Sequence, residues 1–326
     1  MATFSFSGVR LDGMVLAIPK ASDGTRISAP QQTASDLGYE AAVKLLSEKG
    51  VSPSEIGAVL FLSRTPDYRS PATSIVLQGR LGIPVDCLAF DMNLGGAGFV
   101  YGLQVGCSLL ESLTTSYALV FVADTVNRQL APDQKGQGHN DAATAILLRK
   151  APGSRPLVVQ TFADSQGFTS WMIREGGFRK DDPTATDNLP LRKSAGQFIK
   201  EDKEAYNAIL HHRLPESLAQ FLEARALAQT DFTHFAASTL PDGLKAKIKD
   251  ATGIVEEKWA EVPEATGSTA TWALVQSGQG RALVMVHGEG ISWGFADLTL
   301  EADAYLDWLE TDAYFDNGFV THEMPS

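Results

Sequence analysis

His287 and Glu289 are the two side chains whose types and spacing best suit acid–base chemistry in this chain. His287 ends an apolar segment, 282–287, that has the pattern of a buried strand, and Glu289 follows two residues later. Two residues apart on an extended chain, their side chains project to the same side. An imidazole beside a carboxylate can move protons at neutral pH. With a serine hydroxyl in reach, the pair would form a nucleophile, a base and an orienting acid.

The two cysteines, Cys87 and Cys107, are the other candidate nucleophiles. Cys107 falls in an apolar helical pattern and Cys87 precedes a short strand pattern, and free cysteine is common in protein cores, so we expect both to be structural. Two cysteines exclude a disulfide framework and an all-cysteine metal site. Neither the adjacent His211 and His212 nor the other histidines have the spacing of metal ligands. We therefore expect neither a metal nor a cofactor.

The composition describes a globular protein with a large core. The chain has 326 residues, of which 44% are hydrophobic and 20% charged, and its net charge is -12. This length accommodates one large core or two packed halves. An acidic chain without a basic block is a poor general ligand for nucleic acid or an anionic membrane. We recognise neither a targeting signal nor a membrane span, and expect a cytoplasmic protein.

Two runs of alternating helix and strand patterns position these residues. The first run predicts βαβ units and a largely parallel sheet, with a helix capped by Ser35 and Asp36 and stopped by Gly50. In the second run, Pro215 is expected to end or kink a helix over 203–226. The first run comprises helices 37–49, 74–81 and 95–113 and strands 56–62, 88–91, 117–124 and 142–148. The second adds strands 232–237, 282–287 and 293–300 and helices 243–252 and 266–276.

These patterns divide the chain into four parts. Two similar α/β halves, 1–165 and 206–300, flank an irregular connection, 166–205, that is rich in Gly, Pro, Asp and Lys. The last part, 301–326, holds seven acidic residues, no Lys or Arg, and several aromatic residues. Such a tail docks either on the chain's own body or on a partner.

Five segments of the chain, which follow one another in the same order as in that family, resemble the ketoacyl-acyl carrier protein synthase III family of the thiolase fold. That resemblance implies duplicated βαβαβαββ halves in a five-layer α-β-α-β-α arrangement, and a dimer. It also implies decarboxylative condensation of an acyl thioester with a malonyl thioester. The chemistry uses a cysteine thiolate at a helix N-terminus together with a His and an Asn. The segments are TPDYRSPAT (65–73), LGIPVDCLAFDMNLGGAGFVYGL (81–103), YALVFVADTV (117–126), DAATAILL (141–148) and GEGISWG (288–294).

The chain departs from that family at every catalytic position. By the resemblance, Gly96 takes the place of the cysteine, Ser238 that of the histidine and Ser268 that of the asparagine. Glycine has no side chain, so no acyl-enzyme can form there. The segment 18–29 also bridges directly a gap that in active members holds the Trp and Arg for coenzyme A. The backbone N–H groups of Gly96 and Glu289 would still be placed to bind an oxyanion.

Two functions follow from this pattern. The first is a non-condensing subunit, in a homodimer or in a heterodimer with an active ketosynthase III paralogue, in specialised acyl or polyketide-type biosynthesis. The second is an acyltransferase that uses Ser238 or Ser268 with His287 as base and Glu289 orienting it. A homodimeric acyl-binding protein is a third. If the four polar residues do no chemistry, they form a hydrogen-bonded network that fills the vacated site. Docking of an acidic acyl carrier protein would need a local basic patch, formed by Arg174, Arg179, Lys180, Arg192 and Lys193.

Overall fold

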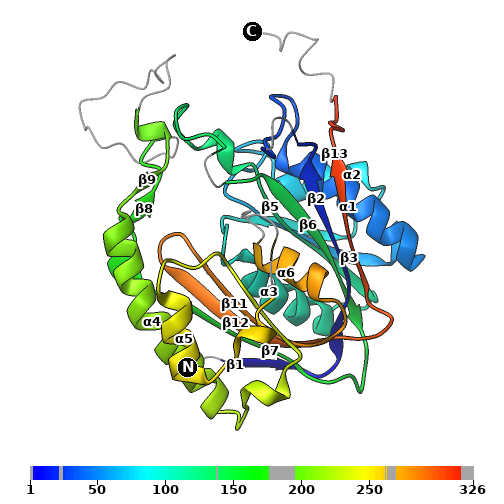
Figure 1. The fold of residues 1–326 in the computed structure, drawn as a ribbon. Coiled ribbons are helices and arrows are strands. Elements are labelled where there is room, and N and C mark those ends of the chain that lie inside the picture. Colours follow the sequence, from blue (N-terminus) through cyan, green and yellow to red (C-terminus); the bar gives the residue numbers. More distant parts are fainter. Residues whose placement is uncertain are drawn as a thin grey trace.

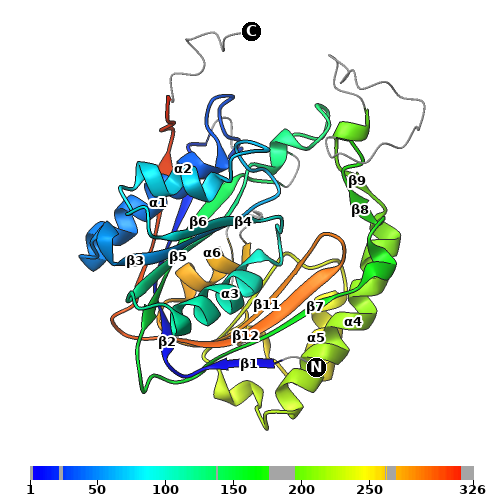
Figure 2. The same ribbon diagram turned by 180° about the vertical axis from the view of Figure 1, so that it is seen from behind.

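A computed structural model describes residues 3–21, 25–136, 139–175, 195–260, 262 and 269–316. Two sheets and six helices in these ranges form five layers in the order α-β-α-β-α (Figures 1 and 2). The predicted thiolase-like architecture is confirmed. The helices are α1 (Ala34–Lys49), α2 (Thr73–Arg80), α3 (Gly98–Ser112), α4 (Lys203–Glu223), α5 (Leu244–Thr252) and α6 (Thr269–Ser277).

The first sheet has six strands in the order β13-β2-β6-β5-β3-β4. β3 runs parallel to β4 and β5, whereas β6 is antiparallel to both β5 and β2. Its strands are β2 (Val9–Pro19), β3 (Ile56–Leu62), β4 (Leu88–Met92), β5 (Tyr117–Asp124), β6 (Ala142–Lys150) and β13 (Tyr305–Thr311).

The second sheet has five strands in the order β1-β7-β12-β11-β10, and only β10 and β11 pair in parallel. The prediction of a largely parallel sheet, made for the first run, holds only in part, because its six-stranded sheet is mixed: β13–β2, β3–β5 and β3–β4 pair in parallel, whereas β2–β6 and β5–β6 pair antiparallel. β5 and β6 are joined without an intervening α-helix, and a parallel pair needs such a crossover. The strands are β1 (Thr3–Phe6), β7 (Leu157–Ala163), β10 (His234–Ala237), β11 (Gly280–Gly288) and β12 (Ser292–Leu300).

The layers are held together by three main apolar clusters. α1 and α2 cover the outer face of the six-stranded sheet, and α4 and α5 cover the outer face of the five-stranded sheet. α3 and α6 lie between the sheets, where side chains such as Phe99 and Leu274 pack in the largest cluster. Because α3 is buried between two sheets, its sequence is apolar around most of its circumference.

Local signals explain where most helices begin and end. α1 starts one residue after Thr33, which forms a capping box with Asp36, and it ends at Gly50 in the left-handed conformation with φ 62°. The prediction that Pro215 ends or kinks the helix over 203–226 was wrong in that α4 runs to Glu223 without ending there. Leu214 and Leu218, both fully buried, hold this part of α4 on the sheet, so tertiary packing overrides the local cost of proline.

The described part of the acidic tail docks on the chain's own body. β13 pairs in parallel with β2 and becomes the edge of the six-stranded sheet (Figure 1). Ion pairs hold this part of the tail there: Lys44 with Asp307, Arg26 with Glu310, Lys20 with Asp312, and both Arg10 and Arg149 with Asp303. Basic residues on the body thus compensate much of the tail's charge, which favours docking on the body over docking on a partner.

The predicted irregular connection contains a short ribbon, β8 (Trp171–Met172) with β9 (Lys200–Glu201), next to the first turn of α4. Residues 176–194 between the two strands lie outside the described ranges, and with them Arg179, Lys180, Arg192 and Lys193 of the predicted carrier-docking patch. No helix in the described ranges has the length and apolar character needed to cross a membrane.

Candidate functional site

A cavity of about 560 Å³ lies where the start of α3, the β11–β12 turn, the β10–α5 loop and the first turn of α4 converge. The tip of the β11–β12 hairpin points towards α4 in Figure 1. Gly96, Ser238, His287 and Glu289 line this cavity, so the structure brings together four of the five predicted site residues. The fifth, Ser268, lies outside the described residues.

Gly96 has no room for a side chain. A Cβ built on it would lie closer than 3.0 Å to the carbonyl oxygen of His287, and 3.3 Å from the Cα of Gly288. Conversely, a Cβ on Gly288 would lie 2.7 Å from the backbone nitrogen of Ala97. The obstructing atoms are backbone, which cannot turn aside as the end of a long side chain can. The β11–β12 turn therefore closes directly over the turn that precedes α3.

His287 is a neutral imidazole with both ring nitrogens engaged. The Tyr206 hydroxyl lies 2.9 Å from Nδ1, and Nε2 lies 2.9 Å from the carbonyl oxygen of Thr239. Because a carbonyl only accepts, Nε2 carries the proton and Nδ1 accepts from Tyr206. Burial lowers the pKa of His287 to about 4 and raises that of Tyr206. The ring is thus fixed in one tautomer and one charge state.

Ser238 is not placed as a nucleophile for this histidine. Its hydroxyl oxygen lies 3.4 Å from the backbone nitrogen of His287, where it accepts a long hydrogen bond. The imidazole, which a nucleophilic serine would need as its base, is bonded to Tyr206 and Thr239 instead. This geometry does not favour an acyltransferase built on Ser238 and His287.

Glu289 belongs to a buried ion cluster at the floor of the cavity. Its carboxylate pairs with Nη1 of Arg64, whose Nε lies 2.9 Å from the Asp124 carboxylate. Burial alone would lower the pKa of the Arg64 guanidinium, but the two carboxylates raise it above its ordinary value. The indole of Trp171 stacks on the same guanidinium, with Cζ 5.0 Å from the ring centroid.

Sequence reasoning missed Arg64, Asp124 and Tyr206. Arg64 follows the end of β3 and Asp124 is the last residue of β5, and these strands are parallel neighbours, with Leu62 opposite Val122. Parallel strands bring their carboxyl ends to one edge of the sheet, so this pair was predictable from the two strand patterns. Tyr206 comes from α4, and no local signal in the sequence ties it to His287.

Neither cysteine is placed as a nucleophile for the cavity. Cys107 is fully buried in α3 and Cys87 is half-buried before β4, and neither lines the cavity. Burial raises the pKa of the Cys87 thiol to about 11 and also raises that of Cys107, so both are protonated at neutral pH. Within the described ranges, no three His, Cys, Asp or Glu side chains are grouped as a metal site.

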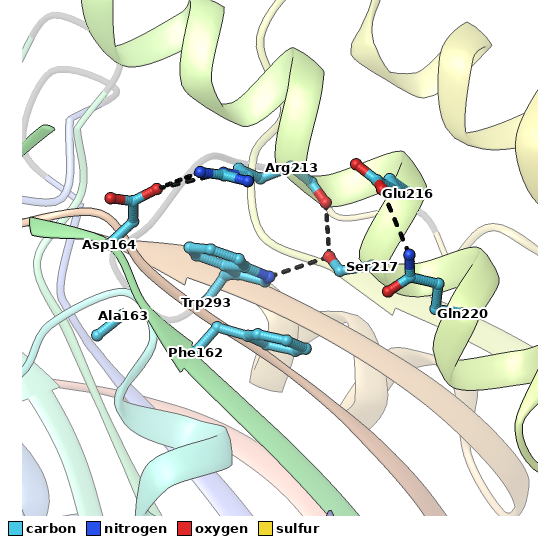
Figure 3. A pocket seen from close by; sticks show the side chains of 8 residues that line it. All are labelled: Phe162, Ala163, Asp164, Arg213, Glu216, Ser217, Gln220 and Trp293. Carbon is cyan, nitrogen blue, oxygen red and sulfur yellow. Dashed lines mark hydrogen bonds and ion pairs between the residues drawn. The ribbon is translucent and has the colours of Figure 1, made fainter. Parts of the chain in front are cut away.

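A second, smaller cavity of about 290 Å³ lies between α4 and the ends of β7 and β12 (Figure 3). Its floor is the stacked pair of Phe162 and Trp293, with ring centroids 5.0 Å apart. The indole N–H of Trp293 donates to Ser217 at 3.1 Å, and Arg213 pairs with Asp164 at the rim. Since these polar groups already satisfy one another, we interpret this cavity as part of the packing of α4 on the sheet.

Comparison with known proteins connects this geometry to one family. A profile of 3-oxoacyl-[acyl-carrier-protein (ACP)] synthase III matches residues 90–167. Beta-ketoacyl-[acyl-carrier-protein] synthase III 3 of Streptomyces coelicolor is 28% identical over 286 residues, 82% of this chain and 83% of that protein. The synthase III of an Enterobacter species is 36% identical over 125 residues, 38% of this chain and 39% of that protein.

Solved structures show the same fold. The 3-oxoacyl-(acyl-carrier protein) synthase of Burkholderia xenovorans superposes with a TM-score of 0.84 at 22% identity, covering 95% of this chain and 99% of that one. The priming beta-ketosynthase of the R1128 polyketide pathway superposes with a TM-score of 0.72 at 19% identity, covering 90% of this chain and 96% of that one.

Proposed function

Since this chain belongs to the beta-ketoacyl-[acyl-carrier-protein] synthase III family, we propose that it is a member without condensing activity. In this proposal it serves as the silent subunit of a dimer, beside an active ketosynthase III paralogue, in specialised acyl or polyketide-type biosynthesis. Acyl carrier protein would deliver substrate to the active subunit.

The observation that carries the proposal is the closed position at Gly96. Condensation by this family needs a thiolate where α3 begins, because the helix dipole lowers the pKa of the thiol and backbone N–H groups stabilise the oxyanion. Here the position has no side chain, and the carbonyl oxygen of His287 occupies the space in which a Cβ would lie. The missing nucleophile and the filling of its space both argue against condensing activity.

Glu289 supports the proposal independently. A Cβ on Gly95 would first meet the Arg64 side chain and would lie 2.9 Å from a carboxylate oxygen of Glu289, so Glu289 sits against the turn that opens α3 together with its partner Arg64. A malonyl thioester brings a carboxylate of its own. Placing that carboxylate near Glu289 costs like-charge repulsion in a partly buried site.

The edge strand β4 supports a role in a dimer. β4 is the last strand of its sheet, and it leads directly into the Gly95–Gly98 turn. Val85 and Leu88, beside this edge, are 96% and 41% exposed. A partner that pairs with this edge would lie next to the Gly95–Gly98 turn beside the cavity. This chain could then shape the active site of that partner.

Intact-protein mass spectrometry tests the proposal. The chain is incubated with acyl-coenzyme A and acyl-carrier thioesters, alone and together with a co-expressed synthase III paralogue. We expect no acyl adduct on this chain and an adduct on the cysteine of the co-purifying partner. A stable adduct on the isolated chain that maps to Ser238 or Ser268 would overturn the proposal in favour of an acyltransferase with a serine nucleophile.

A further inference from the structure

We propose that the cavity at the start of α3 binds a small ligand with a protonated amine, whose ammonium group lies at Glu289 and whose apolar body lies against the cavity walls. The inference rests on the proposed function, because it gives the former condensing site a ligand of the opposite charge to a malonyl group. It also stands on features of the cavity that the proposed function does not use.

The charges at the cavity floor do not balance. Arg64 is the cation of this cluster, and it is shared between two carboxylates, Asp124 and Glu289. At the rim, Glu201 and Lys203 face each other at 3.9 Å and compensate one another. The two histidines in the lining add no positive charge, because burial lowers the pKa of both His139 and His287. The described lining together with Asp124 thus carries one more carboxylate than cations.

The surplus negative charge is accessible from the cavity. One oxygen of the Glu289 carboxylate pairs with Arg64, while the other accepts no hydrogen bond from any residue in the described ranges. The Glu289 side chain is 20% exposed and lines the cavity. A partly buried carboxylate oxygen without a protein donor is best satisfied by a ligand that donates. An ammonium group supplies three donors and the missing positive charge.

The remaining walls fit an apolar body. A cavity of about 560 Å³ is in the range that encloses small organic molecules. Trp171 forms one wall while its ring stacks on Arg64, which fixes the indole in place. An aromatic or branched alkyl amine would bury its hydrocarbon part on these walls with its ammonium group towards the floor. The other apolar residues of the lining are Val126, Leu130, Ile199, Leu240 and Pro241.

Isothermal titration calorimetry of the full chain with three matched probes measures their affinities and tests this assignment. 2-Phenylethylamine carries the positive charge, 2-phenylethanol is its neutral counterpart, and 3-phenylpropanoate is an anion with a side arm of similar length. We expect the amine to bind at least tenfold more tightly than the alcohol, and the anion to bind most weakly. In the Glu289→Gln variant, which keeps the shape and removes the charge, the preference for the amine should fall at least tenfold.

The matched control is Glu223→Gln, which removes the same charge at the exposed C-terminal end of α4, outside the cavity lining, and should change the amine affinity less than twofold. Circular dichroism of each variant checks that the fold is retained, and the three-probe series on the unaltered chain tests the charge preference without any substitution. Failure of the amine to bind, equal affinity for alcohol and amine, or unchanged preference in Glu289→Gln would overturn the inference. None of these results bears on acyl transfer, whereas an acyl adduct on this chain would overturn the proposed function alone.

Discussion

Replacing Gly96 by alanine adds one methyl group at the position on which the proposed function depends. The new Cβ would lie closer than 3.0 Å to the carbonyl oxygen of His287 and 3.3 Å from the Cα of Gly288. Both neighbours are backbone, so the β11–β12 turn or the start of α3 has to move. Overpacking of this kind costs about 1–3 kcal/mol.

The expected net effect includes the unfolded chain. Alanine restricts the unfolded ensemble, which raises the free energy of unfolding by about 0.4–1 kcal/mol wherever the native site accepts the side chain. The clash at Gly96 involves backbone on both sides, so we take the upper part of the overpacking range. The free energy of unfolding of Gly96→Ala should therefore fall by about 2 kcal/mol. Urea denaturation measures this as a lower midpoint at an unchanged m-value.

Two glycines provide matched controls. Gly79, inside α2, has no atom within 4 Å of the point that a Cβ would occupy, so alanine there should stabilise by about 1 kcal/mol through helix propensity alone. Gly98, two residues from the test position, would place its Cβ 3.4 Å from the Leu62 side chain, an ordinary contact. If Gly96→Ala were as stable as these two variants, the position would be open and the closed-site reasoning would be wrong.

Three further predictions follow from single contacts. The pKa of His287 lies near 4 in the folded chain and near 6.5 in the unfolded chain, so the unfolded state binds the proton first as the pH falls. The stability that the neutral His287 ring contributes is complete above pH 6.5. In urea titrations the free energy of unfolding should fall by about 2 kcal/mol between pH 7 and 5, and His287→Gln should abolish this loss. An identical pH profile in the variant would contradict the burial of a neutral ring. Asp124→Ala leaves the buried Arg64 with one carboxylate and should lower the free energy of unfolding by about 3 kcal/mol in the same assay; a change below 1 kcal/mol would show that the cluster is solvated. Phe315→Ala removes an aromatic ring whose centroid lies 4.4 Å from the Arg80 guanidinium and should cost about 1 kcal/mol, whereas no loss would mean that this cation–π contact contributes nothing to stability.

The sequence was sufficient for the architecture because its local signals agree with its packing. The strand over 56–62 and the strand over 117–124 are continuous apolar runs, and both are buried on two faces in the six-stranded sheet. The helix after Gly95–Gly98 is apolar on most sides because it lies between two sheets. The strand over 117–124 and this helix also lie within the residues that the family profile matches, 90–167.

The candidate site was predicted only in part. The resemblance brought Gly96, Ser238, His287 and Glu289 to one cavity, as the structure has them. It did not predict that the His287 ring bonds to Tyr206 rather than to a serine, because that partner comes from α4, on the far side of the connection. Local pattern carries no information about such a contact. The helix that continues through Pro215 was missed for a related reason, since burial on the sheet decides it.

In the proposed dimer, this chain does no condensing chemistry but is needed by a partner that does. The most direct measurement is the rate of beta-ketoacyl thioester formation by a co-expressed synthase III paralogue, with this chain present and absent and with the partner's cysteine intact or replaced by alanine. We expect product only when both chains are present and the partner's cysteine is intact, and we expect Gly96→Cys in this chain to restore no activity to the cysteine-less partner. Product formed by this chain alone, or by the pair without the partner's cysteine, would contradict the proposed function.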